Sequence, residues 1–152
     1  MKQRVLFEEM PRELFSGLER TEMYLKKSNL GAQLQELLKY RVSQINGCAF
    51  CLDMHHKEAI HKGETEQRLH SLAAWRECPY YSEKERAALA LAEALTQAPR
   101  LEVEDIVFDN LLAHFSKTEI AELIMVIAQI NTWNRINITI RAIPGNYVVG
   151  QY

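Results

Sequence analysis

The sequence predicts an all-α protein, folded as one bundle of about six or seven helices. Apolar residues recur three or four positions apart in one segment after another, while segments with the alternation of a strand are hard to find. Only six glycines and four prolines interrupt the chain, and most of them lie where a helix would end. Its 152 residues are typical of a single domain with its own hydrophobic core.

Glycine, proline and capping residues set the expected helix boundaries. One helix should end at Asn46-Gly47, and the next should begin at Cys48 and end at Lys62-Gly63. Ser82 to Glu85 and Ser116 to Glu119 each read as a capping box, which starts a helix. The first expected helix has Leu14, Leu18, Thr21 and Leu25 on one face. A fourth, over about 64–76, should bury Leu69, Leu72 and Ala73. A shorter helix is expected near 103–115, and a last one from Thr118 to about Arg141.

Charge and hydropathy exclude several classes of protein. The net charge is −2 with both signs mixed along the chain, so neither a nucleic acid nor a membrane surface is an expected partner. The first fourteen residues lack the apolar region of a signal peptide. The longest apolar stretch, 120–130, contains Glu122 and Gln129 and is too short to span a bilayer. We therefore expect a cytoplasmic protein, and the apolar stretch suggests burial in an oligomer.

The sharpest feature is the dithiol Cys48-Ala49-Phe50-Cys51. The chain has three cysteines, and an odd number without a secretion signal does not resemble an extracellular disulfide framework. Cys48 lies where a helix should begin, and there the free backbone N–H groups and the helix dipole favour a thiolate over a thiol. The pair can also close a disulfide on one helical turn. Cys78, alone before a proline, is expected to be a bystander.

His55 lies four residues after Cys51 and seven after Cys48, so the three side chains should share one helix face. An imidazole beside a thiol can accept its proton or stabilise the thiolate. One sulfur could then attack the O–O bond of a peroxide and become a sulfenic acid, and the other could condense with it to a disulfide. His56 is rotated away by one helical step and is expected to face solvent.

Other uses of the same residues stay open. Cys48, Cys51 and His55 could supply three ligands of a zinc site. A fourth ligand would have to come from Glu36, a distant histidine or water, because the chain has no second ligand pair, so we expect no metal and no other cofactor. The dithiol could also serve as a general disulfide oxidoreductase, or could sense oxidation without turnover.

Helical spacing alone places Glu36, Tyr40 and Ser43 on one face, away from the apolar stripe of the same helix. Taken alone, this pattern indicates a face in contact with solvent. A different interpretation comes from the family that these residues resemble.

Glu36, Ser43 and the run Asn46-Gly47-Cys48-x-x-Cys51-x-x-x-His55 resemble the core of the alkylhydroperoxidase AhpD-like proteins, in the carboxymuconolactone decarboxylase superfamily. The resemblance extends from about Leu14 to Arg141 within a single domain over residues 1–152. It implies an all-α fold, assembly as a homotrimer or homohexamer, and reduction of a hydroperoxide substrate with electrons from a partner dithiol. The decarboxylase branch generally lacks the dithiol, so the two cysteines argue against lactone decarboxylation.

The resemblance also implies roles for single residues. Cys51 would be the peroxidatic cysteine, Cys48 the resolving one, and Glu36 and His55 the proton relay. Helix electrostatics leaves the order of the cysteines open, because Cys48 is nearer the helix end while Cys51 has the contact with His55. Glu36 would then be buried, and we expect a raised pKa for it. Some family members have a histidine where this chain has Phe50, which predicts slow turnover or a different substrate.

Overall fold

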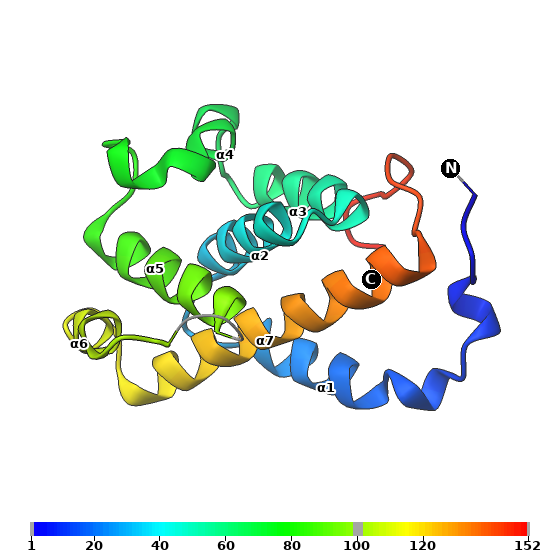
Figure 1. The fold of residues 1–152 in the computed structure, drawn as a ribbon, viewed down its shortest axis with the longest axis horizontal. Coiled ribbons are helices and arrows are strands. Elements are labelled where there is room, and N and C mark those ends of the chain that lie inside the picture. The colour runs from blue at the N-terminus through cyan, green and yellow to red at the C-terminus, as the bar shows by residue number, and fades with distance from the viewer. Residues whose placement is uncertain (1, 99–101, 152) are drawn as a thin grey trace.

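The computed structural model describes residues 2–98 and 102–151, and within these ranges every regular element is a helix (Figure 1). The predicted all-α class is therefore confirmed. The α-helices are α1 (Ser16–Leu25), α2 (Ala32–Asn46), α3 (Ala49–His61), α4 (Glu66–Ser71), α5 (Glu83–Gln97), α6 (Asp105–Leu112) and α7 (Lys117–Ile140). Short 3-10 helices cover Phe7–Glu9, Arg12–Leu14 and Leu72–Glu77.

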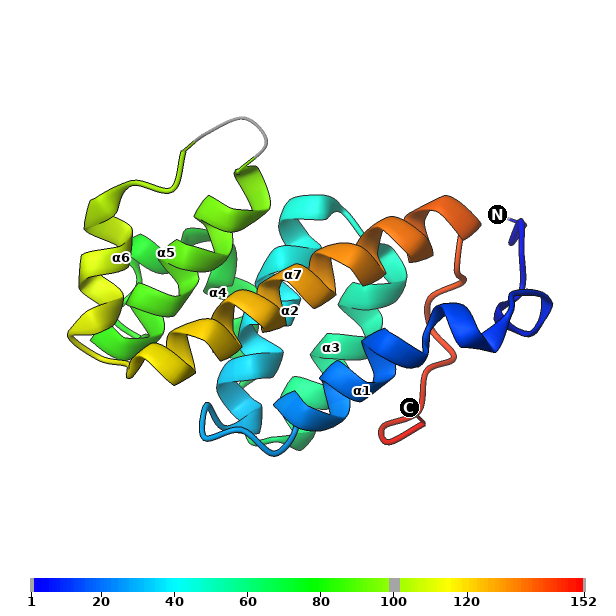
Figure 2. The same ribbon diagram turned by 90° about the horizontal axis from the view of Figure 1, so that it is seen from below.

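Helix α2 lies at the centre of the bundle and packs against α3, α5 and α7. The longest helix, α7, crosses α2, with α1 beside it in both views (Figures 1 and 2). The core between these helices is aliphatic, and burying such side chains is the main favourable contribution to folding. Its fully buried members include Leu37, Leu38, Val42, Ala88, Leu89, Leu123, Val126 and Ile127.

The capping residues start helices where the sequence predicts. Ser82 precedes α5 and accepts a hydrogen bond from the backbone N–H of Glu85, whose carboxylate accepts from the N–H of Ser82. Ser116 and Glu119 make the same reciprocal pair before α7. Gly47 ends α2 with a φ of +69°, a left-handed conformation that glycine adopts without a steric penalty.

Two expectations about the helix faces are wrong. Ala73 is exposed, because the chain kinks at Ala74 and the predicted fourth helix divides into α4 and the 3-10 helix Leu72–Glu77, while Leu69 and Leu72 are buried as predicted. Leu14 precedes α1 in a separate 3-10 helix, and 68% of its surface is exposed. In both cases the prediction continues a helix through a point where that helix ends. The spacing of the apolar residues does not show this point.

The C-terminal segment that follows α7 returns along α3. Lys57 of α3 donates to the carbonyl oxygens of Gly145 and Tyr147, each at 3.1 Å. The N–H of Gly145 donates to Asp53, and the Tyr147 hydroxyl donates to Glu58. Hydrogen bonds thus fix residues 145–147 to α3. None of the described helices is long and apolar enough to cross a membrane.

Candidate active site at the Cys48–Cys51 pair

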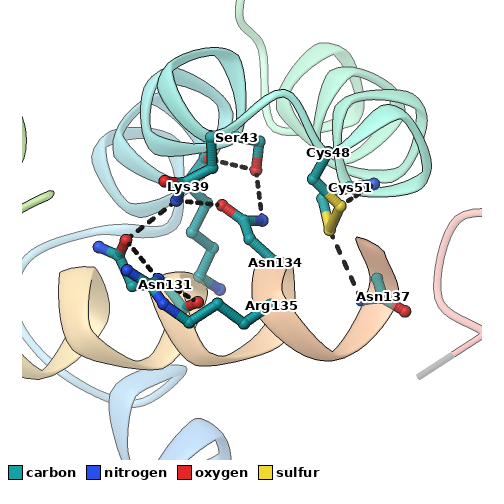
Figure 3. Close-up of a disulfide and its surroundings, with 9 residues drawn as sticks. Lys39, Ser43, Cys48, Cys51, Asn131, Asn134, Arg135 and Asn137 are labelled. Carbon is teal, nitrogen blue, oxygen red and sulfur yellow. Dashed lines mark hydrogen bonds between the residues drawn. A yellow bond between two sulfur atoms is a disulfide. The ribbon is translucent and has the colours of Figure 1, made fainter. Parts of the chain in front are cut away.

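The dithiol lies at the N-terminus of α3, as predicted. Cys48 is the residue that caps the helix, and its sulfur accepts a hydrogen bond from the backbone N–H of Cys51 at 3.4 Å. The two cysteines are joined in a disulfide with Cα atoms 5.3 Å apart (Figure 3), a usual separation for this bond. Only 1% of Cys48 and 0% of Cys51 is exposed. The helix terminus therefore holds both sulfurs in a buried site.

Glu36 of α2 contacts His55 of α3 across the interface of these two helices. Its carboxylate lies 2.7 Å from Nδ1 of His55, and both side chains are largely buried. The solvent-facing position that helical spacing indicates for Glu36 is therefore wrong. Because a carboxylate only accepts hydrogen bonds, Nδ1 must carry the proton, which leaves Nε2 of a neutral ring as the acceptor. The ring is thus oriented as a base.

Lys39 completes a buried ion network around Glu36. Its ammonium lies 3.2 Å from Glu36 and 3.4 Å from Glu22 of α1. Burial alone would raise the pKa of Glu36, but the charges and hydrogen bonds of His55 and Lys39 outweigh it and lower the pKa from 4.5 to about 2. Burial would lower the pKa of Lys39, and the carboxylates of Glu36 and Glu22 raise it instead.

The expected raised pKa of Glu36 is therefore wrong. A carboxyl group with a pKa near 2 is ionised throughout the neutral range and has no proton to give up there. In this position the ionised Glu36 can hold and orient His55. The sequence pattern missed this result because it does not show that Lys39 is buried beside the same carboxylate.

Helix α7 contributes a row of amides that were not among the predicted site residues (Figure 3). Asn137 donates from Nδ2 to the sulfur of Cys51 at 3.5 Å. One turn earlier, Asn134 donates to the hydroxyl of Ser43 at 3.1 Å and accepts from Asn46 at 2.8 Å. Asn131, Asn134 and Asn137 are three positions apart on one face of a mostly apolar helix. That polar stripe was the signal that could have revealed them.

Two buried side-chain polar atoms in the described part of the chain have no hydrogen-bond partner, and both belong to neighbours of Cys51. They are Nε2 of His55, one turn further along α3, and Oδ1 of Asn137. An unsatisfied buried polar group costs about 1–3 kcal/mol, so native proteins contain few of them. One belongs to a side chain that contacts Cys51 and the other to a residue one helical turn from it, so a bound molecule could satisfy both near the dithiol.

The remaining candidates lie outside this site. His56 is half-buried at the surface and pairs with the exposed Glu66 at 2.9 Å. Cys78 is a free thiol in the loop before α5. Among residues 2–98 and 102–151, no group of three or more His, Cys, Asp and Glu side chains is arranged to hold a metal ion.

Comparisons with known proteins agree with the family resemblance and with the fold. A model of the carboxymuconolactone decarboxylase family matches residues 12–94. The uncharacterized protein YdfG of Bacillus subtilis is 44% identical over 138 residues, which cover 91% of this chain and 94% of the relative. The crystal structure of a protein of unknown function from Agrobacterium tumefaciens, for which an AhpD-type role in antioxidant defence has been suggested, superposes with a TM-score of 0.90 at 40% identity. This match covers 96% of this chain and all of that one.

More distant structures support the fold alone. An uncharacterized peroxidase-related protein from Silicibacter superposes with a TM-score of 0.80 at 24% identity, over 94% of this chain and 76% of that one.

Proposed function

The chain belongs to the carboxymuconolactone decarboxylase family, and on this premise we propose that it is a thiol-dependent peroxidase that reduces hydroperoxides with Cys48 and Cys51. The observation that carries the proposal is the Glu36–His55 pair, whose histidine lies one helical turn after Cys51 on α3. A buried carboxylate fixes the imidazole so that the unprotonated nitrogen has no other partner. A base held in this way next to a thiol at a helix N-terminus has the parts of an activated nucleophile.

The proposed cycle begins with both cysteines reduced. His55 accepts the proton of the Cys51 thiol at Nε2, and the ionised Glu36 stabilises the charged ring through Nδ1. The thiolate attacks the terminal oxygen of the hydroperoxide, and the O–O bond breaks. The alkoxide takes the proton from His55 and leaves as an alcohol, while Cys51 becomes a sulfenic acid.

Cys48 then resolves the sulfenic acid. Its thiol attacks the sulfur of Cys51, a water molecule leaves, and the disulfide of the described structure forms. A partner dithiol must return two electrons and two protons to the pair, and it becomes a disulfide itself. Because both sulfurs are buried, we expect this step to need a local opening near the start of α3, whereas a small hydroperoxide needs less room.

We also propose that the protein is a homotrimer or homohexamer. Several large apolar side chains on α6 and α7 are exposed, and exposed apolar surface is typical of a contact between chains. They include Ile106, Phe108, Leu112, Ile124 and Met125. Native mass spectrometry measures the subunit number directly, and a monomer at micromolar concentration would contradict this assembly.

Mass spectrometry of the reduced protein after one equivalent of hydroperoxide tests the peroxidase function. We expect a loss of two hydrogens, located on the peptide that contains Cys48 and Cys51 and reversed by a dithiol. Continued consumption of peroxide with a recycling dithiol would distinguish a peroxidase from a redox sensor. Oxidation by disulfides but not by hydroperoxides would favour a general disulfide oxidoreductase, and two intact thiols with a retained zinc ion would mean a metal site.

Three cysteine variants complete this test. Cys51→Ser should abolish peroxide consumption, and Cys48→Ser should stop the cycle at a sulfenic acid or mixed disulfide. Cys78→Ser is the matched control, because it removes the free thiol outside the site and should leave turnover unchanged. If Cys48→Ser and Cys51→Ser both turned over normally, the mechanism would be wrong.

A further inference from the structure

Asn137 contacts the sulfur of Cys51 with one half of its amide and leaves the other half unused. A disulfide sulfur has no proton to donate, so the N–H group of the amide faces it, at 3.5 Å. Oδ1 belongs to the same planar group, and it is buried without a hydrogen-bond partner in the described chain. A buried acceptor next to the reacting sulfur can therefore bind a donor that arrives with the substrate.

We propose that Asn137 binds the terminal O–H of the hydroperoxide while Cys51 attacks that oxygen, an inference that rests on the proposed peroxidase function. The O–H group would donate to Oδ1 of Asn137, and Nδ2 would keep its contact with the sulfur. Since N and O of one amide lie side by side, the same residue holds both atoms between which the new bond forms. His55, on the adjacent turn of α3, has its free Nε2 for the leaving oxygen.

The step balances with these two residues. The Cys51 thiolate forms a bond to the terminal oxygen, and the electron pair of the O–O bond moves to the alkoxide oxygen. The alkoxide takes the proton that His55 had accepted from the thiol. The sulfur is oxidised by two electrons and the hydroperoxide is reduced to an alcohol. The O–H of the resulting sulfenic acid can still donate to Oδ1 of Asn137, which satisfies that atom in the product.

Asn134 provides a matched comparison on the same helix. It is a buried amide one turn before Asn137, but both halves of its amide are used: it donates to Ser43 and accepts from Asn46. It makes no hydrogen bond to either cysteine in the described structure. A leucine at either position therefore removes an amide of the same size from the same face of α7, but only at Asn137 does it remove a group with a free acceptor beside Cys51.

The test measures two reactions of Cys51 in a Cys48→Ser background, where the sulfenic acid cannot be resolved. One is sulfenic acid formation by a hydroperoxide, followed by trapping. The other is reaction with methyl methanethiosulfonate, which needs the thiolate but offers no O–H or N–H donor. We expect Asn137→Leu to lower the ratio of the two rate constants at least about tenfold, and Asn134→Leu to leave the ratio within about threefold of the parent.

Asn137→Asp keeps the proposal testable if leucine disturbs the packing of α7. Aspartate keeps the volume and one acceptor oxygen but loses the N–H donor to the sulfur, so both reactions should slow while their ratio stays near that of the parent. An equal fall of both rate constants in Asn137→Leu would overturn the proposal, because Asn137 would then act on the thiolate alone. Two unchanged rate constants would overturn it as well. If the Cys48→Ser parent itself formed no sulfenic acid, the peroxidase function would fail with it.

Discussion

Two buried ion networks in this protein resemble each other in composition and differ in how completely they are satisfied. In one, Arg68 lies between Glu64 and Glu85, and its guanidinium also donates to the carbonyl of Tyr80 and stacks over the ring of Tyr81. Burial would lower the pKa of Arg68, but the hydrogen bonds that it donates to Glu64 and Glu85 raise it instead. The groups of this network bind one another, and in the described chain none of their buried side-chain polar atoms lacks a hydrogen-bond partner.

The other network runs from Glu22 through Lys39 and Glu36 to His55 and ends at a nitrogen without a partner. Both networks connect separate helices, so both contribute to the fold. Only the second one leaves a hydrogen-bonding site unused, and it does so next to the dithiol. The two networks therefore differ in the unsatisfied Nε2 of His55 rather than in burial or charge, and the proposed role of His55 rests on that difference.

Removing the cation from the satisfied network should have the largest effect on stability. Glu64 has 0% of its side chain exposed, so Arg68→Met leaves a buried carboxylate without its partner. We expect the free energy of unfolding to fall by about 3–5 kcal/mol in urea titrations, with peroxide turnover per folded molecule unchanged. Arg76→Met is the control, because Arg76 is mostly exposed and Glu93 keeps Arg41, so it should cost less than about 1 kcal/mol. Lost turnover in folded Arg68→Met would contradict the separation of the two networks.

His55→Ala should show the opposite pattern. It removes the base with the free Nε2, and general-base catalysis is worth at least about 100-fold, so peroxide turnover should fall by that factor. The pH at which the Cys51 thiol becomes reactive toward an alkylating reagent should rise, because no imidazole remains to accept its proton. An unshifted alkylation profile would remove His55 from the proposed mechanism, whatever happens to turnover.

The sequence predicts what is decided locally. The capping boxes at Ser82 and Ser116, and the glycine at position 47, fix helix ends through contacts within a few residues, and those ends are found where expected. The placement of Cys48 at the N-terminus of α3 follows for the same reason. The exposed position of Ala73 was missed because the apolar spacing does not show that α4 ends at Ser71 and that a 3-10 helix with a kink at Ala74 follows.

The candidate site depends on contacts between helices, which local spacing does not contain. The residue pattern of α2 does not indicate that α3 covers Glu36. Only the family resemblance predicts that Glu36 contacts His55. The direction of its pKa shift then depends on Lys39, whose burial between Glu22 and Glu36 is a result of three helices packing together. Asn137 was visible as part of a polar stripe on α7, but its contact with Cys51 required the crossing of α7 and α3.

Acid should affect the Glu36 network in a definite pH range. The pKa of Glu36 falls from 4.5 to about 2 on folding, so its ionised form stabilises the folded state above pH 4.5, and this contribution is lost as the pH falls toward 2. Between pH 6 and pH 3 the loss amounts to about 2 kcal/mol for such a shift.

Glu36→Gln should therefore show a flatter decline of unfolding free energy across this range than the natural protein. Glu85→Gln is the companion variant, because Arg68 and Ser82 hold the pKa of Glu85 below its usual value despite its partial burial. Glu85→Gln should flatten the acid profile too, but leave peroxide turnover unchanged, whereas Glu36→Gln should slow it. Equal acid profiles for Glu36→Gln and the natural protein would mean that Glu36 is not held ionised.

The smallest effect is expected next door to the site, at His56. Its ring pairs with Glu66 at 2.9 Å, but 75% of the Glu66 side chain is exposed, and surface pairs of this kind contribute less than about 1 kcal/mol. His56→Ala should therefore change the urea midpoint slightly and leave both turnover and the alkylation profile of Cys51 as they are. The two histidines are adjacent in sequence and point to different sides of α3. Their alanine variants therefore compare a histidine that contacts the buried network with one that does not. If His56→Ala slowed turnover as much as His55→Ala, the contact of His55 with Glu36 would not explain its role as the base.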